Sequence, residues 1–146
     1  MSRNIRKENM TEAVNGAVAS RIGRSILSVF AGLLAVFVLS LGTDQIMHSL
    51  GIYPPLGQPM EDTGLLLCAF AYRCVYGVVG GYVAGRLASY APVGHALVLG
   101  GIGVALSTMG AVAMWDYGPH WYPVALILTA VPLSWAGGML ARRGKA

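Results

Sequence analysis

Long apolar runs separated by short polar links dominate the pattern of this chain. Four such runs lie at about 26–48, 64–86, 94–115 and 121–140, and each reaches the roughly 20 residues that a helix needs to cross a ~30 Å hydrocarbon core. Because backbone polar groups cannot stay unpaired in lipid, we expect all four runs to be α-helices. Short links make consecutive helices antiparallel, so the pattern predicts an all-α membrane four-helix bundle with up-down-up-down topology.

The links and the N-terminal region define the rest of the organisation. Residues 52–63, IYPPLGQPMEDT, contain three prolines, which predict an ordered but irregular loop. Residues 1–23 form a predicted polar tail, with 11–19 as a candidate short surface helix, and residues 24–146 form one four-helix domain. The first apolar run is longer than the core of a typical signal peptide, which favours a retained helix over a cleaved one.

Charged residues are divided unequally between the two ends of the predicted helices. All ten lysines and arginines except Arg73 precede the first helix, close the second or follow the fourth. The opposite side carries only acidic residues: Asp44, Glu61, Asp62 and Asp116. By the positive-inside rule, both termini are cytoplasmic. The net charge of +4 therefore reflects topology, and nucleic acid is not an expected partner.

The composition favours a membrane protein and argues against several kinds of site. Hydrophobic residues make up 55% of the chain and charged residues 11%. Cys68 and Cys74 lie six residues apart on one predicted helix, so their Cα atoms are about 9 Å apart, beyond the reach of a disulfide. His95 lies at the opposite end of the bundle from His48 and His120, which leaves a two-histidine outer site as the metal-binding alternative.

No combination of residues that would support catalysis is recognisable. The sequence shows no nucleophile and base pair, metal-ligand cluster or phosphate-binding loop. The repeated glycines lie inside apolar helices, where they serve packing and do not form a nucleotide-binding fingerprint. We therefore expect neither enzymatic activity nor a metal or cofactor.

Small residues recur at helical spacing in the second and third apolar runs. Gly77, Gly81 and Gly85 follow one another every four residues and form a smooth stripe. Gly103 begins a similar set in the third run. A neighbouring helix can approach such a stripe closely. We expect the stripes to pack helices within one bundle, and homodimerisation through the second helix is the alternative.

Aromatic residues are concentrated in the last link, WDYGPHWYP, at residues 115–123. Amphipathic rings prefer the headgroup layer of a membrane. The sequence therefore predicts an aromatic belt around a tight turn, formed by Trp115, Tyr117, Trp121 and Tyr122.

Arg73 is the one charge inside an apolar run. It lies eight to ten residues into the second helix, roughly 12–15 Å from the outer surface, where an unpaired charge costs from about 3 to more than 10 kcal/mol. Asp44 is the one carboxylate within reach. Three hydroxyls lie at similar depth: Ser107, Thr108 and Thr129. The carbonyl of Leu128, which Pro132 leaves without its helical donor, is a further expected partner.

Two interpretations of this intramembrane polar cluster follow from the residues. In the first, Arg73 and Asp44 form a structural clamp that fixes the helix register. In the second, Arg73 binds an anion or a substrate carboxylate in an outward-facing cavity. The sequence alone does not separate them.

Three segments resemble a group of small, uncharacterised four-span membrane proteins of bacteria: SLGTDQIMHSLGIYPPLGQPM, YRCVYGVVGGYVAGRLA and GPHWYPVALILTAVPLSWAGG. The resemblance implies a multi-pass protein of the bacterial inner membrane and transfers no catalytic residue. We expect a non-enzymatic protein with a structural or interaction role, whose partners are the lipid bilayer and a second copy or another membrane protein. The alternative is a small transporter or channel subunit with Arg73 in its site.

Overall fold

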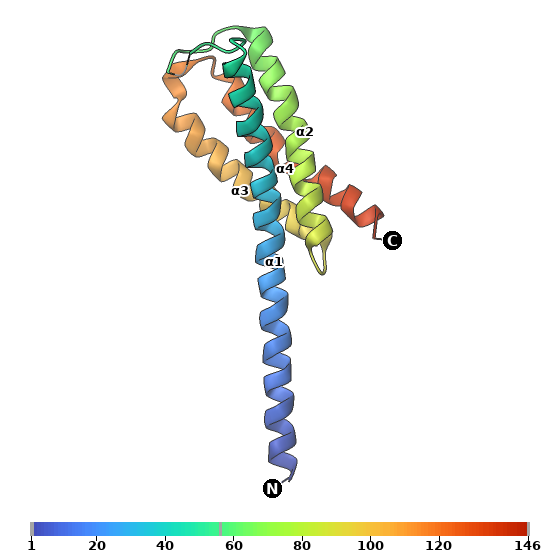
Figure 1. Cartoon of the computed structure of the whole chain (residues 1–146). Helices are drawn as coiled ribbons and strands as arrows, with labels where there is room; N and C mark the ends of the chain where they lie inside the picture. The colour runs from blue at the N-terminus through green and yellow to red at the C-terminus, as the bar shows by residue number, and fades with distance from the viewer. Residues whose placement is uncertain (1, 56, 146) are drawn as a thin grey trace.

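The computed structural model describes residues 2–55 and 57–145, with side chains from Arg6 onward, and consists of long helices (Figure 1). These are α1 (Ser2–Ser49), α2 (Thr63–Leu87), α3 (Pro92–Ala113) and α4 (Trp121–Arg143), with a short 3-10 helix, η1 (Trp115–Tyr117). Each of the four α-helices is long and apolar enough to cross a membrane. No strand occurs in the described residues, so the prediction of an all-α fold with four helices is confirmed.

Successive helices run in opposite directions (Figure 1). The α1–α2 link and the α3–α4 link lie together at one end of the bundle, which we term the loop end. The α2–α3 turn and the end of α4 lie at the opposite end, termed the terminal end, and α1 begins beyond it. The predicted up-down-up-down topology is therefore confirmed, and the start of α1 and the end of α4 lie on the same side.

The first helix is much longer than the hydropathy pattern predicts. α1 is continuous over 48 residues, about 72 Å at 1.5 Å per residue, so one uninterrupted helix replaces the predicted polar tail and the short helix over 11–19. Every side chain from Arg6 to Arg24 is exposed, and this segment extends past the terminal end (Figure 1). The segment contains no proline and is rich in good helix formers, which explains its helical conformation.

The other three helices pack around α2. It lies against α1 and α4 on two faces, and less extensively against α3, whereas α1 and α3 pack against each other only slightly. Two adjacent glycines of α2 allow these close contacts, one with α1 and the other with α4. A Cβ at Gly80 would overlap α1, and a Cβ at Gly81 would overlap the backbone of Ser134 in α4. Gly137 of α4 makes the reciprocal close contact, because a Cβ there would overlap the backbone of α2.

The predicted glycine stripe is used within the chain. Gly77, Gly81 and Gly85 all face α4, and Gly103 of α3 lies against Ala130 of the same helix. The expectation that these glycines pack one bundle is therefore confirmed. Homodimerisation through this stripe would require α4 to be displaced from it.

Candidate functional site

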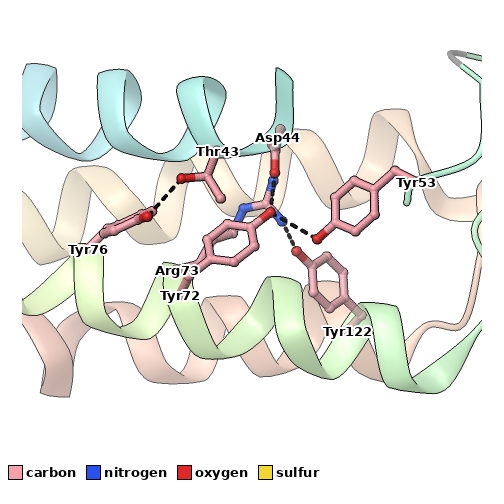
Figure 2. Close-up of polar contacts among 7 residues, drawn as sticks. All are labelled: Thr43, Asp44, Tyr53, Tyr72, Arg73, Tyr76 and Tyr122. Atoms are coloured by element: carbon pink, nitrogen blue, oxygen red, sulfur yellow. Dashed lines mark hydrogen bonds and ion pairs between the residues drawn. The ribbon is translucent and has the colours of Figure 1, made fainter. Parts of the chain in front are cut away.

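Arg73 and Asp44 form the ion pair that the sequence predicts (Figure 2). Nη2 of Arg73 in α2 donates a hydrogen bond to Oδ2 of Asp44 in α1, at 2.5 Å. The two side chains are only 27% and 22% exposed. Because water shields the pair incompletely, each charge depends on the other, and removing either would leave a poorly solvated partner.

Three tyrosines complete a polar network around this pair (Figure 2). Tyr72 donates a hydrogen bond to Oδ1 of Asp44. Arg73 donates through Nη1 to the hydroxyl of Tyr122. Tyr53, which is buried in the α1–α2 link, approaches Tyr72 with 3.2 Å between the hydroxyl oxygens. The network therefore joins α1, α2, α4 and the link.

The guanidinium of Arg73 also lies near two aromatic rings of the network. Its central carbon is 5.5 Å from the ring centre of Tyr72 and 5.8 Å from that of Tyr122. Both distances fall within the range of cation–π attraction. The rings thus add favourable contacts to a cation that has left bulk water.

These tyrosines were not predicted as partners of Arg73 from the sequence, and the assignment of Tyr122 to the aromatic belt was wrong. Trp121 is exposed, whereas the half-buried Tyr122 accepts a hydrogen bond from Arg73. Consecutive helical residues point about 100° apart, so one ring can face outward while the next faces inward. Asp44 lies near the end of α1 and Tyr122 near the start of α4, so the long side chain of Arg73 finds its partners toward the loop end.

The hydroxyls predicted to surround Arg73 do not bind it. Thr108 and Thr129 donate to carbonyls one turn earlier in their own helices, as helical threonines commonly do. Ser107 lines the same cavities as Arg73 without a hydrogen bond to it. In the described chain, the hydrogen bonds of Arg73 go to an aspartate and a tyrosine, so the prediction for the Leu128 carbonyl was wrong.

Two cavities meet at the ion pair. The central cavity, of about 300 Å³, lies between all four helices and is lined mainly by apolar side chains. The loop-end cavity, of about 520 Å³, lies between the two links and is lined by tyrosine, histidine and proline as well as apolar residues. Four residues line both cavities: Asp44, Arg73, Ser107 and Leu126. The ion pair therefore lies where two mainly apolar cavities meet.

The exposure of its lining residues indicates that the central cavity opens to the molecular surface between α1 and α3. These two helices pack against each other only slightly. Phe37 and Leu41 of α1 and Leu106 of α3 line the cavity, and all three side chains are also exposed. They belong to helices apolar enough to span a membrane, so this opening faces the layer that lipid chains occupy in a bilayer.

The histidines are engaged with separate aromatic partners. His48 packs edge-on against Tyr53, and His120 stacks on Trp115 with 4.1 Å between the ring centres. His95 is buried toward the terminal end, where Nδ1 lies 3.1 Å from a backbone carbonyl oxygen of its own helix start. Among the residues described, no group of three His, Cys, Asp or Glu side chains is placed to hold a metal ion.

No protein-family model, curated protein or solved structure matches this chain. Function must therefore be inferred from the geometry around Arg73. The junction of the two cavities offers N–H and O–H donors, aromatic faces and apolar walls. Such a combination suits a small ligand that carries oxygen acceptors on an apolar body.

Proposed function

We propose that this chain is a non-enzymatic, ligand-binding protein of the bacterial inner membrane, a small transporter or channel subunit with Arg73 in its binding site. The observation that supports it is the position of the Arg73–Asp44 pair at the junction of two cavities. Charged residues inside membrane helices are costly and commonly mark a ligand or ion pathway. Both cavities also fall in the size range of small-molecule sites, roughly 300–1,000 Å³.

Asp44 restricts the kind of ligand that Arg73 can bind. The sequence-based alternative has Arg73 meeting an anion or a carboxylate, but the ion pair with Asp44 is neutral as a whole. A doubly charged anion would compete with Asp44 for the guanidinium. A carbonyl compound or a weak carboxylic acid can instead bind the remaining N–H groups and leave the pair intact.

The proposed orientation places both termini in the cytoplasm and the loop-end cavity toward the outside of the cell. It rests on the basic residues other than Arg73, which lie toward the terminal end, and on the acidic residues toward the links. Reporter fusions after Ala146 and after Gly57 test it. We expect the two reporters to report opposite compartments, with the first in the cytoplasm, and reporters in one compartment would contradict the four-span arrangement.

Thermal unfolding of the purified chain in mild detergent tests ligand binding. The added compounds are carboxylic acids and amides of both short and long chain, butyric and dodecanoic acid among them, and inorganic phosphate, each over a range of concentrations. A compound that binds only the folded state adds about 2.7 kcal/mol of stability at 100 times its Kd. Arg73→Lys is the control, because an ammonium keeps the charge and lacks the planar fork of donors. Equal stabilisation of both proteins, or of neither, would contradict the proposal.

The exposed first half of α1 favours a second function, interaction with another protein. Met10, Val14 and Val18 are exposed and lie four residues apart, which places them in one apolar stripe on a helix outside the bundle. A pull-down in mild detergent, compared with a chain lacking residues 6–19, tests this role. A partner that binds only the full chain would support it, and identical partner lists would contradict it.

A further inference from the structure

We propose that the ligand is a single-chain amphiphile, whose oxygen-bearing head binds Arg73 and Tyr122 while its hydrocarbon chain occupies the central cavity. The inference rests on the proposed ligand-binding function and adds the class of ligand and its route of entry. Three observations carry it: the direction of the hydrogen bonds at the junction, the apolar walls of the central cavity, and the opening between α1 and α3.

The hydrogen bonds run in one direction through the polar network. Asp44 as a carboxylate can only accept, so Tyr72 donates to it, and Tyr53 must donate to Tyr72. Arg73 can only donate, so Tyr122 accepts from it. The hydroxyl hydrogen of Tyr122 then has no acceptor in the part of the chain that the structure describes.

The groups left over at the junction are mostly donors. A guanidinium has five N–H groups, and Arg73 uses two of them within the described residues. The Tyr122 hydroxyl adds another donor, whereas both oxygens of Asp44 already accept hydrogen bonds. A head group with acceptor oxygens, such as a carboxylic acid or an ester, completes this network. A cationic head would meet the guanidinium and gain no acceptor.

The central cavity supplies an apolar compartment next to this head site. Six apolar side chains form much of its wall: Leu33, Val36, Phe37, Leu99, Leu106 and Leu133. Along α1 the cavity extends from Leu33 to Asp44, about 16 Å at 1.5 Å per residue, which matches an extended chain of roughly twelve carbons. Hydrocarbon in this space would restore the dispersion contacts that an empty apolar cavity lacks.

The opening between α1 and α3 provides the route for such a molecule. Phe37, Leu41 and Leu106 are exposed at the rim and also line the cavity. A water-soluble ligand would lose its hydration on crossing this apolar rim, which disfavours that route for it. An amphiphile already dissolved in the membrane can pass its chain between the two helices while its head moves toward Arg73.

Cys74 provides a natural reporter inside the central cavity. It lines that cavity, whereas Cys68, the other cysteine, is exposed and lines neither cavity. In a Cys68→Ser chain, the rate at which N-ethylmaleimide labels the remaining thiol therefore measures access to the cavity. A molecule that occupies the cavity should slow this reaction.

The test uses the full-length Cys68→Ser chain in lipid nanodiscs with four probes. Dodecanoic acid and methyl dodecanoate carry acceptor heads, dodecyltrimethylammonium carries a cationic head, and butyric acid lacks the long chain. We expect the first two to slow labelling at least about fivefold near saturation, and the last two less than about twofold. Equal slowing by all three long-chain probes would show a general effect on the bilayer and overturn the proposal, as would no slowing by dodecanoic acid.

Two matched variants test whether protection of the Cys74 thiol depends on open space at the junction of the two cavities. Ser107→Phe places a ring where the cavities meet, and Val112→Phe places the same ring on an exposed position of the same helix. Protection by dodecanoic acid should be lost in the first variant and kept in the second. Gly103→Val, which also narrows the central cavity, replaces Ser107→Phe if that chain does not fold. Unchanged protection in the narrowed variant would overturn the proposal.

The outcomes also separate this inference from the function on which it rests. If butyric acid protects the thiol and stabilises the wild type as strongly as dodecanoic acid does, the head site stands and the amphiphile is excluded. If none of the acids protects the thiol or stabilises the chain, the proposed ligand-binding function fails together with the amphiphile.

Discussion

Toward the terminal end of the bundle, glycines bring helices into backbone contact, whereas toward the loop end the helices separate around two cavities. Gly81 and Gly137 leave no room for a Cβ where α2 crosses α4. At the loop end, the network of Arg73, Asp44 and Tyr122 joins helices that enclose open space. Close packing of small residues needs no polar partner, but a polar network can exchange an internal contact for a ligand. Close helix packing is therefore concentrated in the terminal half, and the loop half contains the candidate site.

The largest expected effect comes from filling the closest helix crossing. Gly81→Leu would drive a side chain into the backbone of α4, where no flexible group can move aside. We expect a loss at or above about 3 kcal/mol, the upper range for overpacking, and little monodisperse protein in size-exclusion chromatography.

The matched control for this prediction is Gly101→Leu in α3. A Cβ at Gly101 meets nothing within 4 Å, so the added side chain points into open space and the chain should purify normally. Equal yields of the two variants would show that backbone contact between α2 and α4 does not hold the terminal half together.

The fold was largely accessible from the sequence because hydropathy and small-residue spacing act over whole helices. Apolar length predicted the four helices, and the spacing of Gly77, Gly81 and Gly85 predicted a close helix contact. The sequence could not show that α4, and not a second copy, covers that stripe, because a smooth surface does not specify its partner. The length of α1 was underestimated, because the polar start of the chain predicted only a candidate short helix over 11–19 and gave no sign that it continues into the first apolar run.

The second prediction concerns the ion pair of the loop half. Arg73→Ala leaves the carboxylate of Asp44 without its cation, and Asp44→Ala leaves the guanidinium without its anion. Each change should lower the stability by about 2–3 kcal/mol, because a partly buried charge loses its partner. The double variant should recover part of the loss, and calorimetry or a thermal shift in detergent measures all three.

Strict additivity of the two losses in stability would contradict the proposed difference between the loop half and the terminal half. It would mean that the ion pair contributes no coupling energy, although contacting residues usually show about 0.5–3 kcal/mol. The loop half would then be held by packing alone, like the terminal half.

A smaller effect is expected at Tyr122, which contributes a hydroxyl and a ring to the network. Tyr122→Phe keeps the ring and removes the acceptor of a charged hydrogen bond, which should cost about 1.5 kcal/mol. Trp121→Phe is the control, because Trp121 is exposed and should change the stability little. A larger loss of stability from Trp121→Phe than from Tyr122→Phe would indicate that the predicted aromatic belt is the main role of this segment.

The candidate site was only partly accessible from the sequence. Arg73 and Asp44 could be paired because a buried charge requires an opposite charge, and few were available. The tyrosines could not be selected from seven in the chain, because helix rotation decides which rings face inward. One interpretation did place Arg73 in an outward-facing cavity, but the lining and the presence of a second cavity could not be predicted, since they depend on how α1 and α3 separate.

The smallest expected effect tests the hydroxyls that the sequence assigned to Arg73. Thr108 and Thr129 donate to carbonyls within their own helices, so Thr108→Val and Thr129→Val leave the Arg73 network unchanged and should alter the stability by less than about 0.5 kcal/mol. Thr129 lines the central cavity and Thr108 is exposed, so Thr129→Val should change dodecanoic acid protection of Cys74 more than Thr108→Val does. The thermal shift and the labelling rate are measured on the same preparations. A loss from either valine variant as large as that from Tyr122→Phe would mean that the helix hydroxyls, and not the tyrosines, hold the guanidinium.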